Sequence, residues 1–309
     1  MSDPIFSPDG KFMWSGSEWI PAHPNSSSQS ADVSLQDSVV GGDVNITQNN
    51  PDDIAQAMVS ALEKLGFVNQ SSPSELTHEQ AEEVEKMLVV AEQIKNQGTK
   101  IEPWTELQLG NAAALVNKSN ISQSHFSCAL DAFRKNGNKE GEAQTLNGLG
   151  FIARINGDLI EAERMQRESL VIHKEIGNNN GEELMLTNLG MLVASRGDVA
   201  EAERMYRESL GLNRFTGNKS NLSLTLNNLG DLLEKRGDFD GALRLYEESL
   251  TINKEIGNLH GMALNYLGLG DISNLQNDHT SAEQHWREHV RILREIGAPI
   301  DHKFIEKGY

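Results

Sequence analysis

Between Gly137 and Ile296 the apolar residues recur every three or four positions, in two runs per interval that a Gly-Asp pair separates. This spacing predicts amphipathic α-helices, because residues three and four apart lie on one face of a helix. The glycines lie where the predicted helices end, as expected of residues that adopt a left-handed conformation there. Each interval therefore predicts two helices. In one interval the apolar positions are Leu186, Leu189 and Val193, then Ala202, Met205, Tyr206 and Leu210.

The pattern returns at a constant spacing of 40 residues. Gly-Asn begins at Gly137, Gly177, Gly217 and Gly257, and Gly297 opens a further interval. Leu-Gly begins at Leu149, Leu189, Leu229 and Leu269, with an earlier copy at Leu109. A bulky position holds Phe126, Gln166, Tyr206, Tyr246 and Trp286 in turn. A period of this length is typical of a solenoid, in which each helix pair buries its apolar face only by stacking on its neighbours.

The order Leu-Gly, then alanine twelve residues after the glycine, then an aromatic residue four further on is similar to the tetratricopeptide repeat. The 40-residue spacing resembles the longer variety found in kinesin light chains and polarity adaptors. Four copies fit between residues 137 and 296, and a degenerate copy covers residues 97–136. The resemblance implies an all-α fold, an α-α superhelix. The sequence departs from the pattern at Ser169, Ser209 and Ser249, where the family usually has a second alanine.

In the resembled family the first helix of each pair lines a concave groove. By register, the groove residues here are Asn147, Phe151 and Arg154, then Thr187, Met191 and Ala194, then Asn227, Asp231 and Glu234, and last Leu267, Asp271 and Asn274. These positions differ between copies, whereas Leu-Gly does not, as expected if they recognise a partner. Exposure to solvent alone also explains the variation.

The charge of the predicted groove changes along the array. It is apolar and basic at Phe151 and Arg154, and acidic at Asp231, Glu234 and Asp271. A peptide with apolar anchors and a basic portion would complement it.

The chain before the repeats divides into three segments. Residues 1–21 predict a hairpin that contains Trp14 and Trp19. Residues 22–50 read as a linker followed by short alternating strands, which suggests self-association as a hypothesis and a local hairpin as its alternative. Residues 51–96 predict two capping helices, the second with a capping box formed by Thr77 and Gln80.

Composition narrows the class of partner. The net charge is -18 and no block of the chain is basic, which argues against nucleic acid and anionic membranes as partners. The apolar runs are shorter than the roughly 20 residues that a membrane span needs. A single cysteine, Cys128, excludes an internal disulfide, so we expect a cytoplasmic protein. Cys128 itself is predicted to be a buried structural thiol.

No constellation with the spacing of a known catalytic motif occurs. His285 and His289 lie one turn apart, but the residue after the first is Trp286, where a zincin has glutamate. Because His289 stands at the serine position of the other copies, we interpret it as a packing substitution. We therefore predict neither an enzyme nor a metal or cofactor site.

The prediction is a protein-binding adaptor or scaffold, with a partner protein or peptide in the groove. Residues 297–309, the tail, are expected to cover only part of the last helix pair. Two alternatives remain open. One is a sensor or accessory subunit whose array binds a small ligand, and the other is a metal-binding enzyme subunit that uses His285 and His289.

Overall fold

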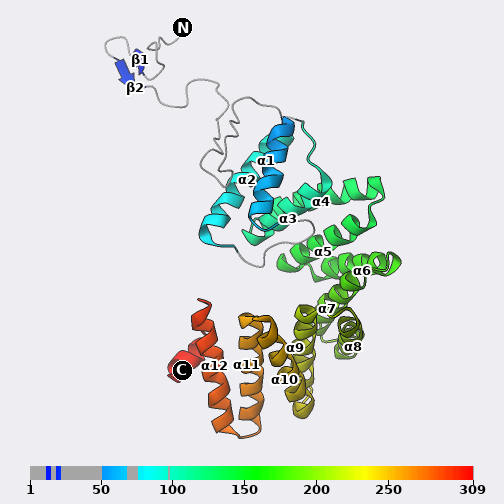
Figure 1. The fold of residues 1–309 in the computed structure, drawn as a ribbon, viewed down its shortest axis with the longest axis vertical. Helices are drawn as coiled ribbons and strands as arrows, with labels where there is room; N and C mark the ends of the chain where they lie inside the picture. Colours follow the sequence, from blue (N-terminus) through cyan, green and yellow to red (C-terminus); the bar gives the residue numbers. More distant parts are fainter. Residues whose placement is uncertain (1–11, 15–18, 22–50, 68–75, 97, 309) are drawn as a thin grey trace. The chain divides into compact units, whose positions relative to one another are not determined.

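The computed structural model describes residues 12–14, 19–21, 51–67, 76–96 and 98–308, and the chain divides into two compact units, residues 1–100 and 101–309 (Figure 1). In the first unit, strands β1 (Phe12–Trp14) and β2 (Trp19–Pro21) pair antiparallel, with Trp14 opposite Trp19. The turn predicted between them and the self-associating segment predicted within residues 22–50 lie outside the described residues, so self-association stays a prediction.

The first unit also contains two helices, α1 (Pro51–Lys64) and α2 (His78–Asn96). Proline is tolerated at the start of α1 because the first turn needs no backbone donor. The predicted capping box is confirmed at the start of α2. The backbone N–H of Thr77 donates to Gln80 Oε1 at 2.9 Å, and the N–H of Gln80 donates to Thr77 Oγ1 at 3.3 Å. The apolar face of α2, which contains Val84, Met87, Leu88, Ala91 and Ile94, is buried.

The second unit is an all-helical solenoid, as predicted (Figure 1). Its first helices are α3 (Pro103–Leu115), α5 (Lys139–Ile155), α7 (Asn179–Ser195), α9 (Lys219–Lys235) and α11 (Leu259–Leu275). Its second helices are α4 (Ser119–Asn136), α6 (Leu159–Glu175), α8 (Val199–Thr216), α10 (Phe239–Ile256) and α12 (His279–Glu295), followed by α13 (His302–Glu306). Each first helix packs on the second helix of its pair, and each second helix packs on the next first helix.

The Gly-Asn pairs end one helix and begin the next. Gly217 has φ of 74°, in the left-handed region that glycine adopts at low cost. The side chain of Asn218 then accepts a hydrogen bond from the backbone N–H of Asn221 and caps α9. Asp158 and Asp198 cap the second helices α6 and α8 through hydrogen bonds from the backbone N–H groups of Glu161 and Glu201. At Asp158 only this half of a capping box is formed, because the Glu161 carboxylate binds Arg164.

Glycine lets each aromatic residue lie directly against a first helix. A Cβ atom at Gly230 would lie 2.7 Å from Cε1 of Tyr246, and one at Gly268 would lie 2.6 Å from Cε2 of the same ring. The ring of Tyr246 is therefore held between α9 and α11. Trp286 lies in the same way against Gly270. This contact explains why Leu-Gly and the aromatic position recur together.

The serines at the family's usual alanine position form a repeated hydrogen bond. Ser169, Ser209 and Ser249 each donate to the carbonyl oxygen of the residue 26 positions earlier in the paired first helix. In the last copy His289 takes this role, with its Nδ1 2.8 Å from the carbonyl oxygen of Ala263. A carbonyl only accepts, so Nδ1 carries the proton. The interpretation of His289 as a packing substitution is confirmed.

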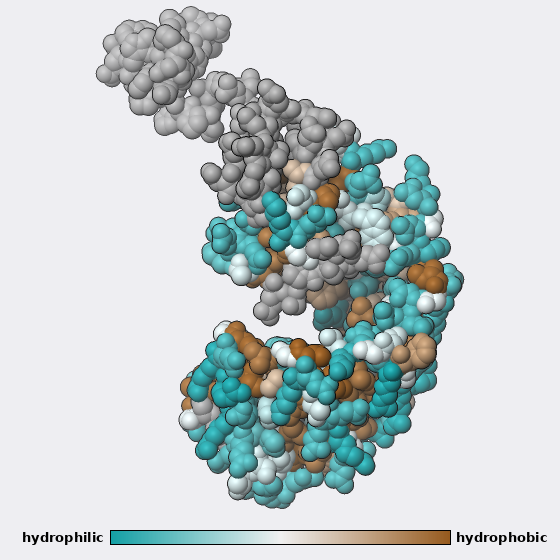
Figure 2. Space-filling model, in the orientation of Figure 1, coloured by the Kyte–Doolittle hydropathy of each residue, from teal (hydrophilic) through white to brown (hydrophobic). Residues whose placement is uncertain are grey.

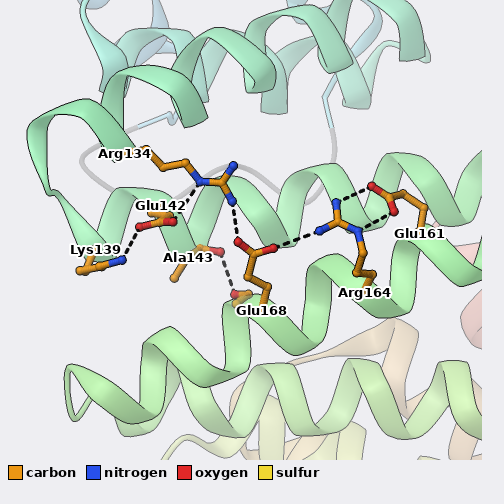
Figure 3. A network of polar contacts seen from close by, with 8 residues as sticks. Arg134, Lys139, Glu142, Ala143, Glu161, Arg164 and Glu168 are labelled. Atoms are coloured by element: carbon orange, nitrogen blue, oxygen red, sulfur yellow. Dashed lines mark hydrogen bonds and ion pairs between the residues drawn. The ribbon is translucent and has the colours of Figure 1, made fainter.

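Ion pairs connect successive second helices at one register. Arg134, Lys174 and Arg214 bind Glu168, Glu208 and Glu248, each 34 residues further on. Figure 3 shows the first of these, in which the Glu168 carboxylate lies between Arg134 and Arg164. Each exposed pair contributes at most about 1 kcal/mol, so the ladder adds little to the stability of the array.

The tail packs on the last pair. Phe304 of α13 is buried, and its ring lies 6.1 Å from that of Trp286 and 5.3 Å from that of His289. Ile305 beside it is exposed.

Candidate functional site

Helices α5, α7, α9 and α11 each leave one face uncovered. On α7 this face contains Leu184, Met191 and Ser195, which are all exposed, while Leu186, Leu189 and Val193 on the opposite side are buried. The exposed residues are spaced at four and seven positions, which places them on one side of the helix. We call the corresponding strip on α5, α7, α9 and α11 the open face. Figure 2 shows a surface that is largely hydrophilic in this view, with hydrophobic residues scattered between the polar ones.

Several predicted groove residues lie on the open face. Phe151, Arg154, Met191, Asp231 and Asn274 are exposed. These residues stand directly after Leu-Gly or three positions further on. The other groove residues at these two positions, Ala194, Glu234 and Asp271, are half-buried. These eight are positioned as the register implied, although nothing in the structure shows a partner on them.

The position two residues before Leu-Gly is different. Thr187 is fully buried, so its assignment to an exposed groove is wrong. Its Oγ1 lies 2.8 Å from Oγ1 of Thr225 in α9. Asn227 is 9% exposed, and its Oδ1 accepts from Nδ2 of Asn265 in α11. Thr187 and Asn227 are buried for the same reason. Their position faces the next first helix, and the side chain forms a hydrogen bond to it.

Asn147 and Leu267 at the same position are half-buried. Asn147 accepts a hydrogen bond from Asn188 of α7, and Leu267 packs near Trp286 and Phe304. The two remaining members of this register therefore also serve packing within the array.

The open face also carries a row of leucines that the sequence pattern did not predict to be exposed. Leu184, Leu224 and Leu264 lie 40 residues apart on the open face and are 37%, 39% and 38% exposed. Each comes seven residues, or about two turns, before Met191, Asp231 or Asp271. The sequence shows these residues as a leucine that recurs every 40 residues. By spacing alone, such a leucine is expected to lie in the core.

Arg154 marks one end of the open face. Its guanidinium lies over the ring of Phe151, 5.3 Å from the ring centroid, in a cation–π contact. Both side chains are exposed. The pair forms an apolar and positively charged surface on α5.

Two aromatic residues hold carboxylates at the acidic end. The hydroxyl of Tyr246 lies 2.6 Å from Asp231 Oδ1 and 2.8 Å from Glu234 Oε2, and Nε1 of Trp286 donates to Asp271 Oδ1 at 2.9 Å. Desolvation of the carboxyl raises the pKa of Asp231, against the hydrogen bond from Tyr246. Desolvation also raises the pKa of Glu234, and the charges of Asp271 and Asp231 add to the effect.

His289 and Cys128 are the side chains whose chemistry the sequence raised. Among the described residues, no group of three or more His, Cys, Asp or Glu side chains could hold a metal ion. His289 is buried, and desolvation lowers its pKa. The prediction that Cys128 is buried is wrong: it is exposed, because it lies off the apolar stripe of α4 that contains Phe126, Ala129 and Phe133. No helix in the described part of the chain is long and apolar enough to cross a membrane.

The repeats match a known family. The tetratricopeptide repeat family matches residues 141–214 and 221–295. These residues are tetratricopeptide repeats. No curated protein matches the sequence.

Several solved structures share the fold. BtubC (BKLC) from P. vanneervenii is 15% identical, with a TM-score of 0.56 over 82% of this chain and 95% of that one. PilF from Pseudomonas aeruginosa is 16% identical, with a TM-score of 0.54 over 84% of this chain and 100% of that one. Kinesin light chain repeats from Podosopora anserina are 12% identical, with a TM-score of 0.51 over 63% of this chain and 98% of that one. At these identities the likeness shows the fold alone.

Proposed function

We propose that the chain is an adaptor or scaffold that binds a segment of another protein on the open face of its tetratricopeptide repeats. Proteins built from these repeats generally mediate protein–protein interactions. The proposal rests on one observation. The buried Leu-Gly pair recurs in every first helix, whereas the position directly after it on the open face changes from Phe151 and Met191 to Asp231 and Asp271.

This contrast has a physical basis. A buried position is constrained in every copy by the neighbouring helix, while an exposed one is constrained only by what it contacts in solution. The open face also combines half-exposed apolar side chains with fixed carboxylates. The apolar side chains supply binding energy when they are covered, and the carboxylates supply specificity through charge. Cytoplasmic location remains part of this proposal, together with a partner that is a protein or a peptide.

A pull-down from native lysate tests the proposal with two double variants. One carries Met191→Glu and Asp231→Lys on the open face. The matched control carries Val171→Glu and Glu247→Lys, which make the same chemical changes at exposed positions of α6 and α10. We expect the first variant to lose a protein that the intact chain and the control retain. Retention by both variants, or loss from both at unchanged helicity, would contradict the proposal.

A further inference from the structure

Two parallel rows of side chains cross three neighbouring first helices. The first row is Leu184, Leu224 and Leu264, which are exposed to nearly the same extent. The second row, seven residues further along each helix, is Met191, Asp231 and Asp271. The first row is apolar throughout, and the second becomes acidic on α9 and α11. The two rows therefore form one strip with an apolar edge and an acidic edge.

The spacing along the leucine row selects the conformation of a partner. Helix α9 contacts both α7 and α11, and helices packed in this way lie about 8–10 Å apart. Residues seven apart in an α-helix point the same way and are separated by about 10.5 Å. In an extended strand, residues on one side are separated by about 6.7 or 13 Å. A partner helix with an apolar residue at every seventh position thus matches the row, and a strand does not.

The width of the strip also fits a helical partner. The two rows are seven residues apart on each first helix, which is about 10 Å along the helix axis. An α-helix with its side chains is about 10–12 Å wide. A single helix lying across α7, α9 and α11 therefore covers both rows at once.

Charge selects the side chains along one edge of that helix. Asp231 and Asp271 lie on the second row, and Glu234 lies one turn beyond Asp231, with Lys235 as the basic residue next to it. Hydrogen bonds from Tyr246 and Trp286 hold the carboxylates of Asp231 and Asp271. A partner edge with Lys or Arg complements this row, and an acidic edge is repelled.

We propose that the strip binds an amphipathic partner helix with leucine-like residues seven positions apart and Lys or Arg along the edge that faces Asp231 and Asp271. This inference rests on the proposed function and specifies the partner of the same surface. The half-exposed leucines enter the apolar stripe of the partner, and the acidic row fixes which edge of the partner faces which row. The arrangement gives one favoured orientation of the bound helix.

A synthetic peptide of about three heptads, with leucine at every seventh position and lysine along one edge, is the probe. Its affinity for the full chain is measured by fluorescence anisotropy. Two control peptides carry glutamate in place of lysine, or proline at the centre, where it breaks a helix. We expect the basic peptide to bind, added salt to weaken it, and both controls to bind at least tenfold more weakly.

Variants of the chain locate the contact. Leu224→Ser is expected to weaken binding about fivefold, since covering the exposed part of one leucine is worth about that factor. Asp231→Asn is expected to reduce the salt dependence. Phe215→Ser, at a residue of α8 that is 80% exposed, is the matched control and should change nothing. Thermal melts verify that each variant stays folded.

The outcomes separate this inference from the function beneath it. Equal binding of the proline peptide would exclude a helical partner. Equal binding of the acidic peptide would exclude the charge assignment. Absence of peptide binding, or an unchanged affinity in Leu224→Ser, would overturn the inference. Loss of a native partner from the open-face double variant would still support the proposed function in each of these cases.

Discussion

Replacing Gly230 by alanine tests the packing that generates the 40-residue period. The new methyl group would lie 2.7 Å from Cε1 of Tyr246, closer than the roughly 3.5 Å at which carbon atoms attract. The ring cannot retreat easily, because it is 1% exposed, touches Gly268 on its other side and is bonded through its hydroxyl to Asp231. Overpacking of this kind costs about 1–3 kcal/mol.

A matched variant removes the effect of helix propensity. Gly211 lies within α8, and a Cβ atom there would meet nothing within 4 Å. Gly211→Ala should therefore stabilise the chain by about 0.5–1 kcal/mol, the usual gain of alanine over glycine inside a helix. Gly230→Ala has the same gain in helix propensity, but the clash with Tyr246 destabilises it. The two variants should differ in stability by about 1–3 kcal/mol.

The assay is thermal unfolding followed by circular dichroism, with hydrogen exchange to locate the effect. Repeat arrays do not always unfold in one step, so exchange in α9, α10 and α11 is the decisive readout. We expect faster exchange there in Gly230→Ala than in Gly211→Ala. Equal stabilisation by both substitutions would show that the glycine is not required for the close approach of Tyr246.

Three further predictions follow from buried polar groups and helix caps. Ser209→Ala should cost about 1–3 kcal/mol, since its hydroxyl bonds the carbonyl of Glu183 in the interior; denaturant melts should show no such loss for the exposed Ser127→Ala. Burial raises the pKa of Glu183, so its ionisation destabilises the folded chain as the pH rises through the pKa of the folded state. Glu183→Gln should therefore raise the melting temperature at neutral pH and raise it less in acid. A gain in melting temperature that is larger in acid would refute the reasoning. Asp238→Ala removes the cap that accepts from Gly241 and should cost about 1 kcal/mol by the same melts.

Much of the fold follows from the sequence because its determinants are local. Helix periodicity, the Gly-Asn pairs and the capping residues act within a few positions of one another, so the capping box of Thr77 and Gln80 could be assigned without a structure. The pairing of Leu-Gly with the aromatic residue also repeats often enough to reveal the contact. The exposed position of Cys128 could have been read from the stripe of α4, because it lies off that stripe.

The position of Thr187 could not be assigned in this way. Its burial depends on how closely α7 approaches α9, which is a contact between residues about 40 positions apart. The leucine row was missed for the opposite reason. Leu224 has the spacing of a core residue, and only the packing of neighbouring helices leaves it half exposed. Register carried over from a family thus locates a helix face, and the burial of each side chain depends on its neighbours.

Site-specific photo-crosslinking tests the central claim most directly. A photoreactive phenylalanine analogue is placed at Met191 on the open face, which is 39% exposed, and at Val171 on the second helix α6 as a control that is 55% exposed. The account predicts that, in the native lysate, a partner protein crosslinks to the chain from position 191 and not from position 171. Crosslinking from position 171 alone would place the contact on the second helices and contradict the account.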